Sequence, residues 1–338
     1  MRFIKACRRE KTDATPVWFM RQAGRYMPEY RALRAKWTLL EMCERPELAA
    51  EVSLQPLRLG VDAVILFADI LLPVRPVGVK LEFVKGEGPA LTPAVRTAGE
   101  IDALRDFDPA SELSYVMGAL RILRRELEGK VPLIGFAGAP FTLAAYLVEG
   151  GPSEDHAKVK AMMRSEPALW DRLMRKLSKV TADYLLAQAA AGAQVLQLFD
   201  SWAGALTREE YVRCVQPHSR AVFSAVAKAG VPLIHFGTNT GPFLEDLRDA
   251  GGDVIGVDHR VPLDEAWKRI GCDRAVQGNL DPEALLGPRD ELLSKVDEVL
   301  RRAGGRPGHI FNLGHGILQQ TPVENVRAVA DRVHEKTA

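Results

Sequence analysis

Two arginines in one short turn are the first residues of this sequence that could do chemistry. Arg21 and Arg25 flank Gly24, directly after the apolar run at residues 17–20. A guanidinium group binds carboxylates or phosphates through two parallel hydrogen bonds. The spacing therefore predicts a clamp for an anionic ligand, although two solvated loop charges would have the same spacing.

A carboxylate and a histidine have equally unusual neighbours. Asp69 lies among Phe67, Ile70 and Leu71, where a charge is costly unless a ligand or a helix end compensates it. His315 lies between two glycines, which give it little side-chain cover and favour a binding site over a core position. Asp69 therefore fits either a ligand site or a capping role, and His315 fits a ligand site better.

Four more candidates are less specific by pattern alone. Ser201 follows an apolar run and fits either a ligand contact or a helix N-cap. Arg34 is equally compatible with an exposed helix charge, and Tyr146 and Phe199 have spacings common in a core. Because neither Lys nor Cys ends any expected strand, Schiff-base and thiolate chemistry are disfavoured.

Eight short apolar runs must position these residues. They lie at residues 17–20, 63–67, 131–136, 194–199, 231–236, 254–257, 275–277 and 309–313. Continuous runs of this length are typical of parallel strands that are buried on both faces.

Helical patterns separate the runs. Apolar residues at 3–4 spacing from Trp170 to Tyr184 predict a helix capped by Ser165. Thr207 and Glu210 predict a capping box before a helix that stops at Gly230. Residues 321–324 predict a third start, with Pro in the first helical position.

The alternation of strands and helices predicts an α/β fold, a single (β/α)₈ TIM barrel domain over residues 1–338. In the long connection between strands 2 and 3, residues 79–91 alternate around Gly86 and Gly88, which predicts an extra hairpin. An open doubly wound sheet is the alternative, but no glycine-rich phosphate loop follows a strand. In a barrel the chemistry lies where strands end, which is where most candidates fall.

Composition narrows the classes of protein. Among 338 residues, 45 Lys and Arg balance 44 Asp and Glu, which disfavours nucleic-acid binding. Four cysteines without a CxxC pair argue against a disulfide framework or zinc knuckle and favour a cytoplasmic location. Residues 131–148 are uncharged but interrupted by Pro and Gly, so we expect a buried strand and helix start there rather than a membrane span.

The segments at residues 16–31 and 135–150 closely resemble signature segments of the uroporphyrinogen decarboxylase family. Similar segments at 67–71, 199–201, 277–282 and 312–316 follow in the family's order. The sequence departs from the family at His259, where many members have Trp, and at Gln319 and Gln320, where an acidic residue often precedes the Thr-Pro pair. The loop at 237–241 is also variable.

The resemblance implies decarboxylation of the four acetate arms of uroporphyrinogen III to give coproporphyrinogen III, in heme biosynthesis. It further implies a homodimer that needs no cofactor and no metal. The family's catalytic and substrate-binding residues correspond to Arg21, Arg25, Arg34, Asp69, Tyr146, Phe199, Ser201 and His315.

The resemblance also suggests how these residues act. Asp69 would face the pyrrole nitrogens and favour a ring cation, while Phe199 would pack on the macrocycle. The proton donor stays open between Arg21, His315 and water, because Arg is a poor acid and His has a more suitable ordinary pKa.

Two other hypotheses use the same fold or the same residues. A zinc-dependent corrinoid or thiol methyltransferase would need Cys ligands, and the corresponding places hold His235-Phe236-Gly237 and residues 314–316 instead. A non-catalytic tetrapyrrole carrier would keep the arginines but would not need Asp69 to face the centre of the ring.

Overall fold

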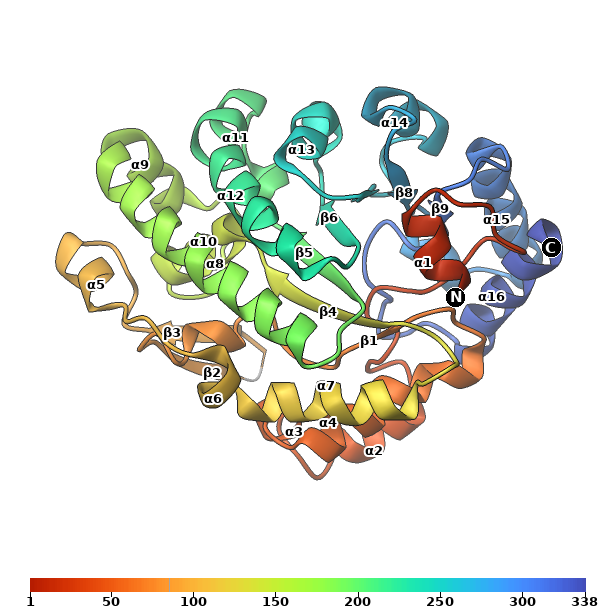
Figure 1. The fold of residues 1–338 in the computed structure, drawn as a ribbon, viewed down its shortest axis with the longest axis horizontal. Helices are drawn as coiled ribbons and strands as arrows, with labels where there is room; N and C mark the ends of the chain where they lie inside the picture. The colour runs from red at the N-terminus through yellow and green to blue at the C-terminus, as the bar shows by residue number, and fades with distance from the viewer. Residues whose placement is uncertain (85) are drawn as a thin grey trace.

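A curved parallel sheet with helices on its outer face forms the framework of the computed structural model, which describes residues 1–84 and 86–338 (Figure 1). Seven strands are hydrogen-bonded in chain order: β1 (Val64–Ile65), β4 (Leu133–Gly138), β5 (Val195–Asp200), β6 (Leu233–Gly237), β7 (Val254–Gly256), β8 (Ala275–Gln277) and β9 (His309–Ile310). All of these pairs are parallel. The fold is TIM-barrel-like, and seven of the eight expected apolar runs are strands.

The first expected strand, at residues 17–20, is corrected by the structure. Only Val17 pairs, in a single parallel bridge to Phe311. Trp18 N–H donates to the Phe311 carbonyl at 3.2 Å, and Asp62 N–H donates to the Val17 carbonyl at 2.7 Å. The segment thus contacts the end of β9 on one side and the start of β1 on the other, without forming a regular strand.

Side chains end the pairing of this segment. The Phe19 N–H donates to the Gln22 side-chain oxygen at 3.1 Å, and the Met20 N–H donates to the Asn312 side-chain oxygen at 3.0 Å. These acceptors replace the backbone carbonyls that a strand ladder would supply. Residues 21–25 are therefore free to turn back toward the centre of the sheet.

Helices cover the outer face of the sheet. The longer ones are α4 (Pro46–Leu54), α7 (Ser114–Glu126), α8 (Pro140–Glu149), α9 (Ala157–Ser165), α10 (Pro167–Ala190), α12 (Gln216–Val226), α14 (Leu263–Ile270), α15 (Arg289–Ala303) and α16 (Val323–Thr337). Shorter ones are α1 (Arg2–Cys7), α2 (Pro28–Arg34), α3 (Leu39–Cys43), α5 (Ala98–Ala103), α6 (Pro109–Glu112), α11 (Arg208–Cys214) and α13 (Leu244–Ala250). None of the helices in the described part of the chain is long and apolar enough to cross a membrane.

The expected helix starts have mixed outcomes. The capping box is confirmed, since Thr207 Oγ1 accepts from Glu210 N–H at 3.2 Å and Glu210 accepts from Thr207 N–H at 3.0 Å. The Ser165 cap is wrong, because Ser165 ends α9 and α10 begins at Pro167. At α16 the proline is the N-cap residue rather than the first helical residue.

The helix that starts at the confirmed capping box is shorter than expected. It ends at Cys214, and α12 begins at Gln216 with Pro217 in its first turn, where the missing N–H costs nothing. A 3₁₀ turn continues α12 to Gly230, which adopts a left-handed conformation with φ of 68° and stops the helical run.

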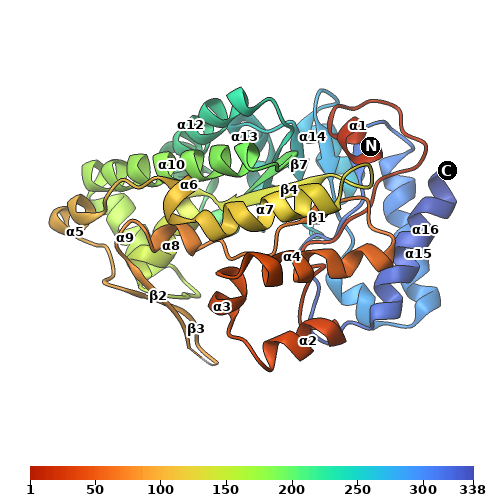
Figure 2. The same cartoon turned by 60° about the horizontal axis from the view of Figure 1, so that its bottom comes forward.

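The expected hairpin is confirmed as β2 (Lys80–Val84) paired antiparallel with β3 (Gly88–Thr92). Gly88 has a φ of 93°, a conformation that glycine adopts without strain. The Leu91 N–H donates to the Gly150 carbonyl at 2.9 Å, which ties β3 to the end of α8. Figure 2 shows the hairpin projecting from the body beside α8.

One end of the curved sheet is closed by the N-terminal helix. Phe3, Ala6 and Cys7 of α1 are buried in one cluster with Ile134, Val195, Ile234, Val254 and Ile310 from the strands. This apolar plug fills the end of the sheet at which the strands begin. The cavity at the carboxyl ends of the strands lies on the other side of this plug.

Candidate active site at the carboxyl ends of the strands

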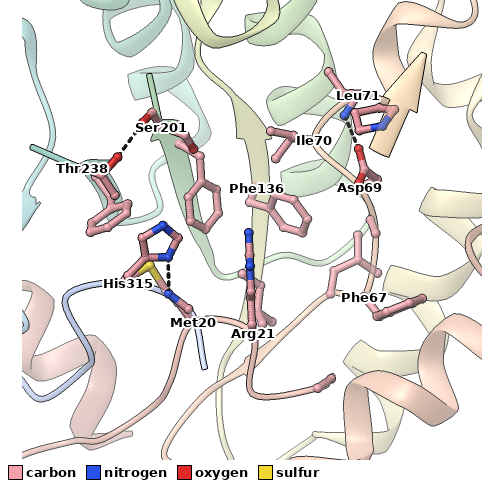
Figure 3. A pocket seen from close by; sticks show the side chains of 18 of the residues that line it. Met20, Arg21, Phe67, Asp69, Ile70, Leu71, Phe136, Ser201, Thr238 and His315 are labelled. Atoms are coloured by element: carbon pink, nitrogen blue, oxygen red, sulfur yellow. Dashed lines mark hydrogen bonds between the residues drawn. The ribbon is translucent and has the colours of Figure 1, made fainter. Parts of the chain in front are cut away.

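A cavity of about 380 Å³ opens where the strands end (Figure 3). Six of the predicted site residues line it: Arg21, Asp69, Tyr146, Phe199, Ser201 and His315. They come from segments up to almost 300 positions apart in the sequence, and the parallel sheet brings them to one end.

Two predicted residues, Arg25 and Arg34, do not line the cavity. Arg25 is exposed in the turn before α2, and Arg34 ends α2 and donates to the Trp37 carbonyl. Burial raises the pKa of the Tyr30 hydroxyl, while the charges of Arg34 and Arg25 act in the opposite direction. The Tyr30 ring packs edge-on against Phe67, a cavity-lining residue, at 5.7 Å. The two arginines thus lie one layer behind the cavity wall.

The backbone of Arg21 is in an unusual conformation. Its φ is 62°, in the left-handed region that non-glycine residues rarely occupy. Gln22 anchors the turn by donating to the Ala63 carbonyl at 3.0 Å, and Tyr26 donates to the Gln22 carbonyl at 2.6 Å. A Cβ on Gly316 would lie 2.4 Å from Arg21 Cδ, so a larger residue there would displace this side chain.

This strained turn directs the guanidinium into the cavity. Figure 3 shows Arg21 standing between His315 on one side and Asp69 on the other. In the part of the chain that the structure describes, no carboxylate forms an ion pair with Arg21. The guanidinium is therefore available to an anionic ligand.

Asp69 uses one carboxylate oxygen locally. Its Oδ1 accepts from the Leu71 N–H at 2.8 Å, which supports the turn that precedes residues 72–74. Burial raises the pKa of this carboxyl group, whereas the Leu71 N–H and the charge of Arg21 act in the opposite direction. One oxygen of Asp69 thus has the predicted capping role. The same carboxyl group also lines the cavity.

His315 carries no charge at neutral pH. Its Nδ1 accepts from the Gly316 N–H at 2.6 Å, which assigns the ring proton to Nε2. Burial, followed by the positive charge of Arg21, lowers the pKa of His315 to about 4. At neutral pH the ring therefore offers a hydrogen bond from Nε2 but carries no charge.

Three phenylalanines from adjacent strands form the floor. Phe136 and Phe199 pack edge-to-face at 5.5 Å, and Phe199 and Phe236 at 6.1 Å. Beneath them, Trp18 donates to Gln277 at 2.9 Å and Gln277 donates to Gln197 at 3.3 Å. The floor is thus an apolar surface on a hydrogen-bonded layer, suited to a flat, partly aromatic ligand.

Tyr146 lies on the wall with a residue that the sequence patterns did not single out, Trp202. Their rings are 5.8 Å apart in an edge arrangement. Burial raises the pKa of Tyr146 to about 12, the charge of Asp69 acts in the same direction, and a hydrogen bond from Trp202 and the charge of Arg21 oppose it. Trp202 directly follows Ser201, so its position after a strand was the available signal.

Ser201 is held by its backbone. Thr238 Oγ1 donates to the Ser201 carbonyl at 2.6 Å, and Thr238 itself lines the cavity. The short 3₁₀ turn Ala203–Ala205 has Trp202, not Ser201, in the N-cap position. Phe83 and Pro89 of the hairpin also line the cavity, which sequence patterns did not indicate.

The strand-end residue Asp258 is structural. It is buried and accepts from the Arg260 N–H at 2.8 Å and from the Asn239 N–H. The backbone of His259 lies 2.1 Å from where a Cβ on Gly314 would be, so glycine is required there. His259 is not among the residues that line the cavity.

The positions that would hold zinc ligands do not converge. His235 is fully buried behind the sheet, with Nδ1 3.1 Å from the Leu247 carbonyl, while His315 lines the cavity. Among residues 1–84 and 86–338, no group of three or more His, Cys, Asp or Glu side chains is arranged to hold a metal ion.

Comparison with known proteins gives a consistent result. The family model described as uroporphyrinogen decarboxylase (URO-D) matches residues 1–336. The uroporphyrinogen decarboxylase of Sorangium cellulosum is 61% identical over 333 residues, which cover 98% of this chain and 95% of that protein. That of Carboxydothermus hydrogenoformans is 55% identical over 334 residues, with 98% and 95% coverage.

Solved structures support the fold. A methyltransferase from Methanosarcina mazei superposes with a TM-score of 0.79 at 22% identity and covers 99% of this chain and 98% of its own. A B12-independent methionine synthase from Shewanella sp. has a TM-score of 0.60 at 12% identity, with 86% and 88% coverage. At these identities the likeness extends to the fold alone.

Proposed function

This chain belongs to the uroporphyrinogen decarboxylase family, and we propose that its cavity is where uroporphyrinogen III loses its four acetate carboxyl groups to give coproporphyrinogen III. One observation carries the assignment to this cavity. The carboxyl group of Asp69 and the guanidinium of Arg21 share an aromatic-floored cavity, and neither has an ion-pair partner among the residues that the structure describes. Both charges are thus available to a substrate that offers N–H groups and carboxylates.

The chemistry needs a place for the electrons of the breaking bond. Protonation of the pyrrole carbon that bears the acetate arm makes the ring a cation. The bond to the carboxylate then breaks, CO₂ leaves, and the electron pair moves into the ring. Protonation of the resulting exocyclic methylene, with loss of the ring-carbon proton, gives the methyl group. The conversion of each acetate arm to a methyl group consumes one proton overall.

In this scheme Asp69 accepts hydrogen bonds from the pyrrole N–H groups and stabilises the ring cation electrostatically. Arg21 binds a substrate carboxylate, and Phe199 packs on the macrocycle above the floor. Arg25 and Arg34, which lie outside the cavity lining, would bind the propionates that extend beyond the cavity. Ser201 and Tyr146, which line the cavity, would form hydrogen bonds with the substrate.

Arg21, His315 and water are the alternative proton donors. The low pKa of His315 does not remove it from this set, because a bound carboxylate raises the pKa of a nearby imidazole. A comparison of His315→Asn with Arg21→Lys in solvent-isotope experiments separates the three.

Several finer features are part of the same proposal. The segment at 17–20 takes the place of the eighth strand in a single (β/α)₈ barrel over residues 1–338, the protein acts as a homodimer in the cytoplasm, and no metal or organic cofactor takes part. Light scattering on the purified chain tests the dimer. Dialysis against a strong chelator tests metal independence, and zinc-restored activity would support a methyltransferase-like enzyme.

The decisive experiment is turnover. Purified protein is incubated anaerobically with reduced uroporphyrinogen, and the products are separated by the number of carboxyl groups. Coproporphyrinogen formed by the wild type but not by Asp69→Asn supports the proposal. Tight binding of uroporphyrinogen without turnover would support the tetrapyrrole carrier instead.

A further inference from the structure

Three aromatic rings form a row that ends at the active-site cavity. The His156 ring lies 5.2 Å from the Trp202 ring, and the Trp202 ring lies 5.8 Å from the Tyr146 ring. Trp202 and Tyr146 line the cavity, whereas His156 lies behind them, outside the lining. The ring of His156 thus reaches the cavity wall through its contact with Trp202.

His156 is built into a rigid position. It is only 3% exposed and has a left-handed backbone with φ of 54°, which is unusual for a residue with a side chain. The Ser153 hydroxyl accepts its N–H at 3.0 Å, and Asp155 accepts the next N–H, of Ala157, at 3.1 Å. His156 Nδ1 has no hydrogen-bond partner among the described residues. A buried imidazole held in a strained conformation costs stability, which points to a role for the ring.

The loop that carries His156 is also fixed from both sides. Glu149, the last residue of α8, accepts from the Val159 N–H at 3.0 Å and so joins α8 to α9. Gly150 accepts from Leu91 in the hairpin at 2.9 Å. The ring of His156 thus sits on a scaffold that also holds Tyr146, which lies in α8.

The backbone of Trp202 is held by its neighbours. A Cβ on Gly204 would lie 2.1 Å from the Thr238 carbonyl, so the chain that follows Trp202 packs directly on the neighbouring loop. The Ala205 N–H donates to the Trp202 carbonyl at 3.0 Å. With the backbone fixed in this way, the two rings that flank the indole add to the core contacts that orient it.

We propose that His156 is a positioning residue for the decarboxylation: it holds Trp202, and Trp202 holds the Tyr146 hydroxyl in place beside Asp69. This inference rests on the function proposed above. Tyr146 needs such support because it lies in the last turn of a short helix at the cavity wall. When the row is loosened, the chemical step slows while release of partly decarboxylated substrate does not. Intermediates with seven, six or five carboxylates then leave the site more often.

The test compares three variants at equal conversion of uroporphyrinogen. His156→Ala opens the row and is expected to lower kcat about tenfold, since small misplacements of site groups cost up to about a hundredfold. It should also raise the fraction of seven-, six- and five-carboxylate intermediates. His156→Phe keeps a ring against Trp202 and should restore both quantities most of the way.

The matched control is His218→Ala. His218 is likewise buried, with its Nε2 3.6 Å from Asp171, but it lies on α12 and does not line the cavity. This variant should lose a similar amount of stability and keep the wild-type pattern of intermediates. The proposal is overturned if His156→Ala gives the same intermediates as His218→Ala, or if His156→Phe is no better than His156→Ala.

A second pair covers the case in which His156→Ala does not fold. Trp202→Phe should retain the row and release few intermediates, and Trp202→Ala should release many. Equal intermediate patterns from these two would also overturn the proposal. A wild type that binds but does not turn over uroporphyrinogen would instead contradict the proposed function, so the two failures are distinguishable.

Discussion

The two ends of the curved sheet differ in whether an aspartate that lines the cavity forms an ion pair. At the end where the strands begin, a second cavity of about 490 Å³ is lined by two aspartates, Asp253 and Asp273, that both have partners within the protein. Asp273 pairs with Arg274 at 2.8 Å and with Arg248 at 3.3 Å, and Asp253 accepts from the Leu233 N–H at 2.8 Å. At the end where the strands finish, Arg21 and Asp69 share a cavity without an ion pair.

This difference separates stability from function. Paired charges at one end satisfy each other and leave little for a ligand to gain. Unpaired charges at the other end, together with the strained backbone of Arg21, cost stability that a ligand can recover. Active sites of barrel enzymes lie at the carboxyl ends of the strands, and here Arg21 and Asp69 share a cavity at that same end.

The strongest way to break the comparison is to remove the charge of Asp69. Asp69→Asn keeps the shape of the side chain but cannot stabilise a ring cation. We expect kcat to fall by about 10²–10³-fold, the usual cost of losing one electrostatic group that acts on the transition state. KM should change less than kcat, because an amide oxygen still accepts a hydrogen bond.

Steady-state kinetics with folding checked by circular dichroism measures this effect. Asp69→Glu, which moves the charge by one methylene, is the companion variant, and partial activity there would mean that charge matters more than position. A folded Asp69→Asn protein with wild-type kcat would reduce Asp69 to the turn contact it makes with Leu71.

Removal of the arginines should have the next largest effect. It compares an arginine inside the cavity with one outside its lining. Arg21→Ala should lower kcat/KM by roughly 10–100-fold, since a hydrogen bond to a charged group contributes about 1.5–3 kcal/mol. Arg25→Ala should cost less, because Arg25, unlike Arg21, lies outside the cavity lining. If the two variants are equally impaired, the substrate extends past the cavity to the rim. If both are near normal, the anion clamp lies elsewhere.

The contrast between these two arginines shows where prediction from sequence stops. The signature turn placed Arg21 and Arg25 together, but only the left-handed backbone at Arg21 decides which of them enters the cavity. The same limit applies to the segment at 17–20, where pairing stops because Asn312, 292 positions away, accepts the Met20 N–H. The apolar runs predicted the seven strands because local hydrophobicity sufficed there.

Local signals did best where the interaction itself is local. The Thr207 and Glu210 capping box and the hairpin at 79–91 involve residues close in sequence, and both are present. The stacking of His156, Trp202 and Tyr146 joins three separate segments, and neither spacing nor composition indicates it. The sequence therefore indicated the functional end of the fold better than the contacts that support it.

Asp69→Asn is also expected to have a smaller effect on stability. The variant should be less active but more stable than the wild type. Burial raises the pKa of Asp69 in the folded state, so its charge destabilises the fold at neutral pH. Asp69→Asn should therefore raise Tm at pH 7 only slightly, by about 1–2 °C, because the unfolding entropy of a chain of 338 residues makes the shift in Tm small. As the pH falls through the raised pKa toward the unfolded value near 3.8, wild-type Asp69 becomes protonated and the advantage should disappear.

Thermal unfolding of both proteins between pH 7 and pH 4 measures this difference, and no substrate is needed. His315→Asn serves as the control, because a histidine with a pKa of about 4 is uncharged over most of this range. An Asp69→Asn protein that is less stable than the wild type at pH 7 would mean that Asp69 is paired in the folded state.

The smallest effect is expected at the other end of the sheet. Asp273→Asn removes the partner of Arg274 and Arg248, all three of which are partly exposed. Exposed ion pairs contribute about 0.2–1 kcal/mol, so the free energy of unfolding should fall by no more than that. Because this cavity is separated from the active site by the apolar plug of Phe3 and the strand residues, kcat and KM should stay at wild-type values.

Kinetics and urea unfolding on the same preparation test both statements. A clear loss of activity in a stable Asp273→Asn protein would show that the two ends are coupled, and the separation of stability from function would then be wrong.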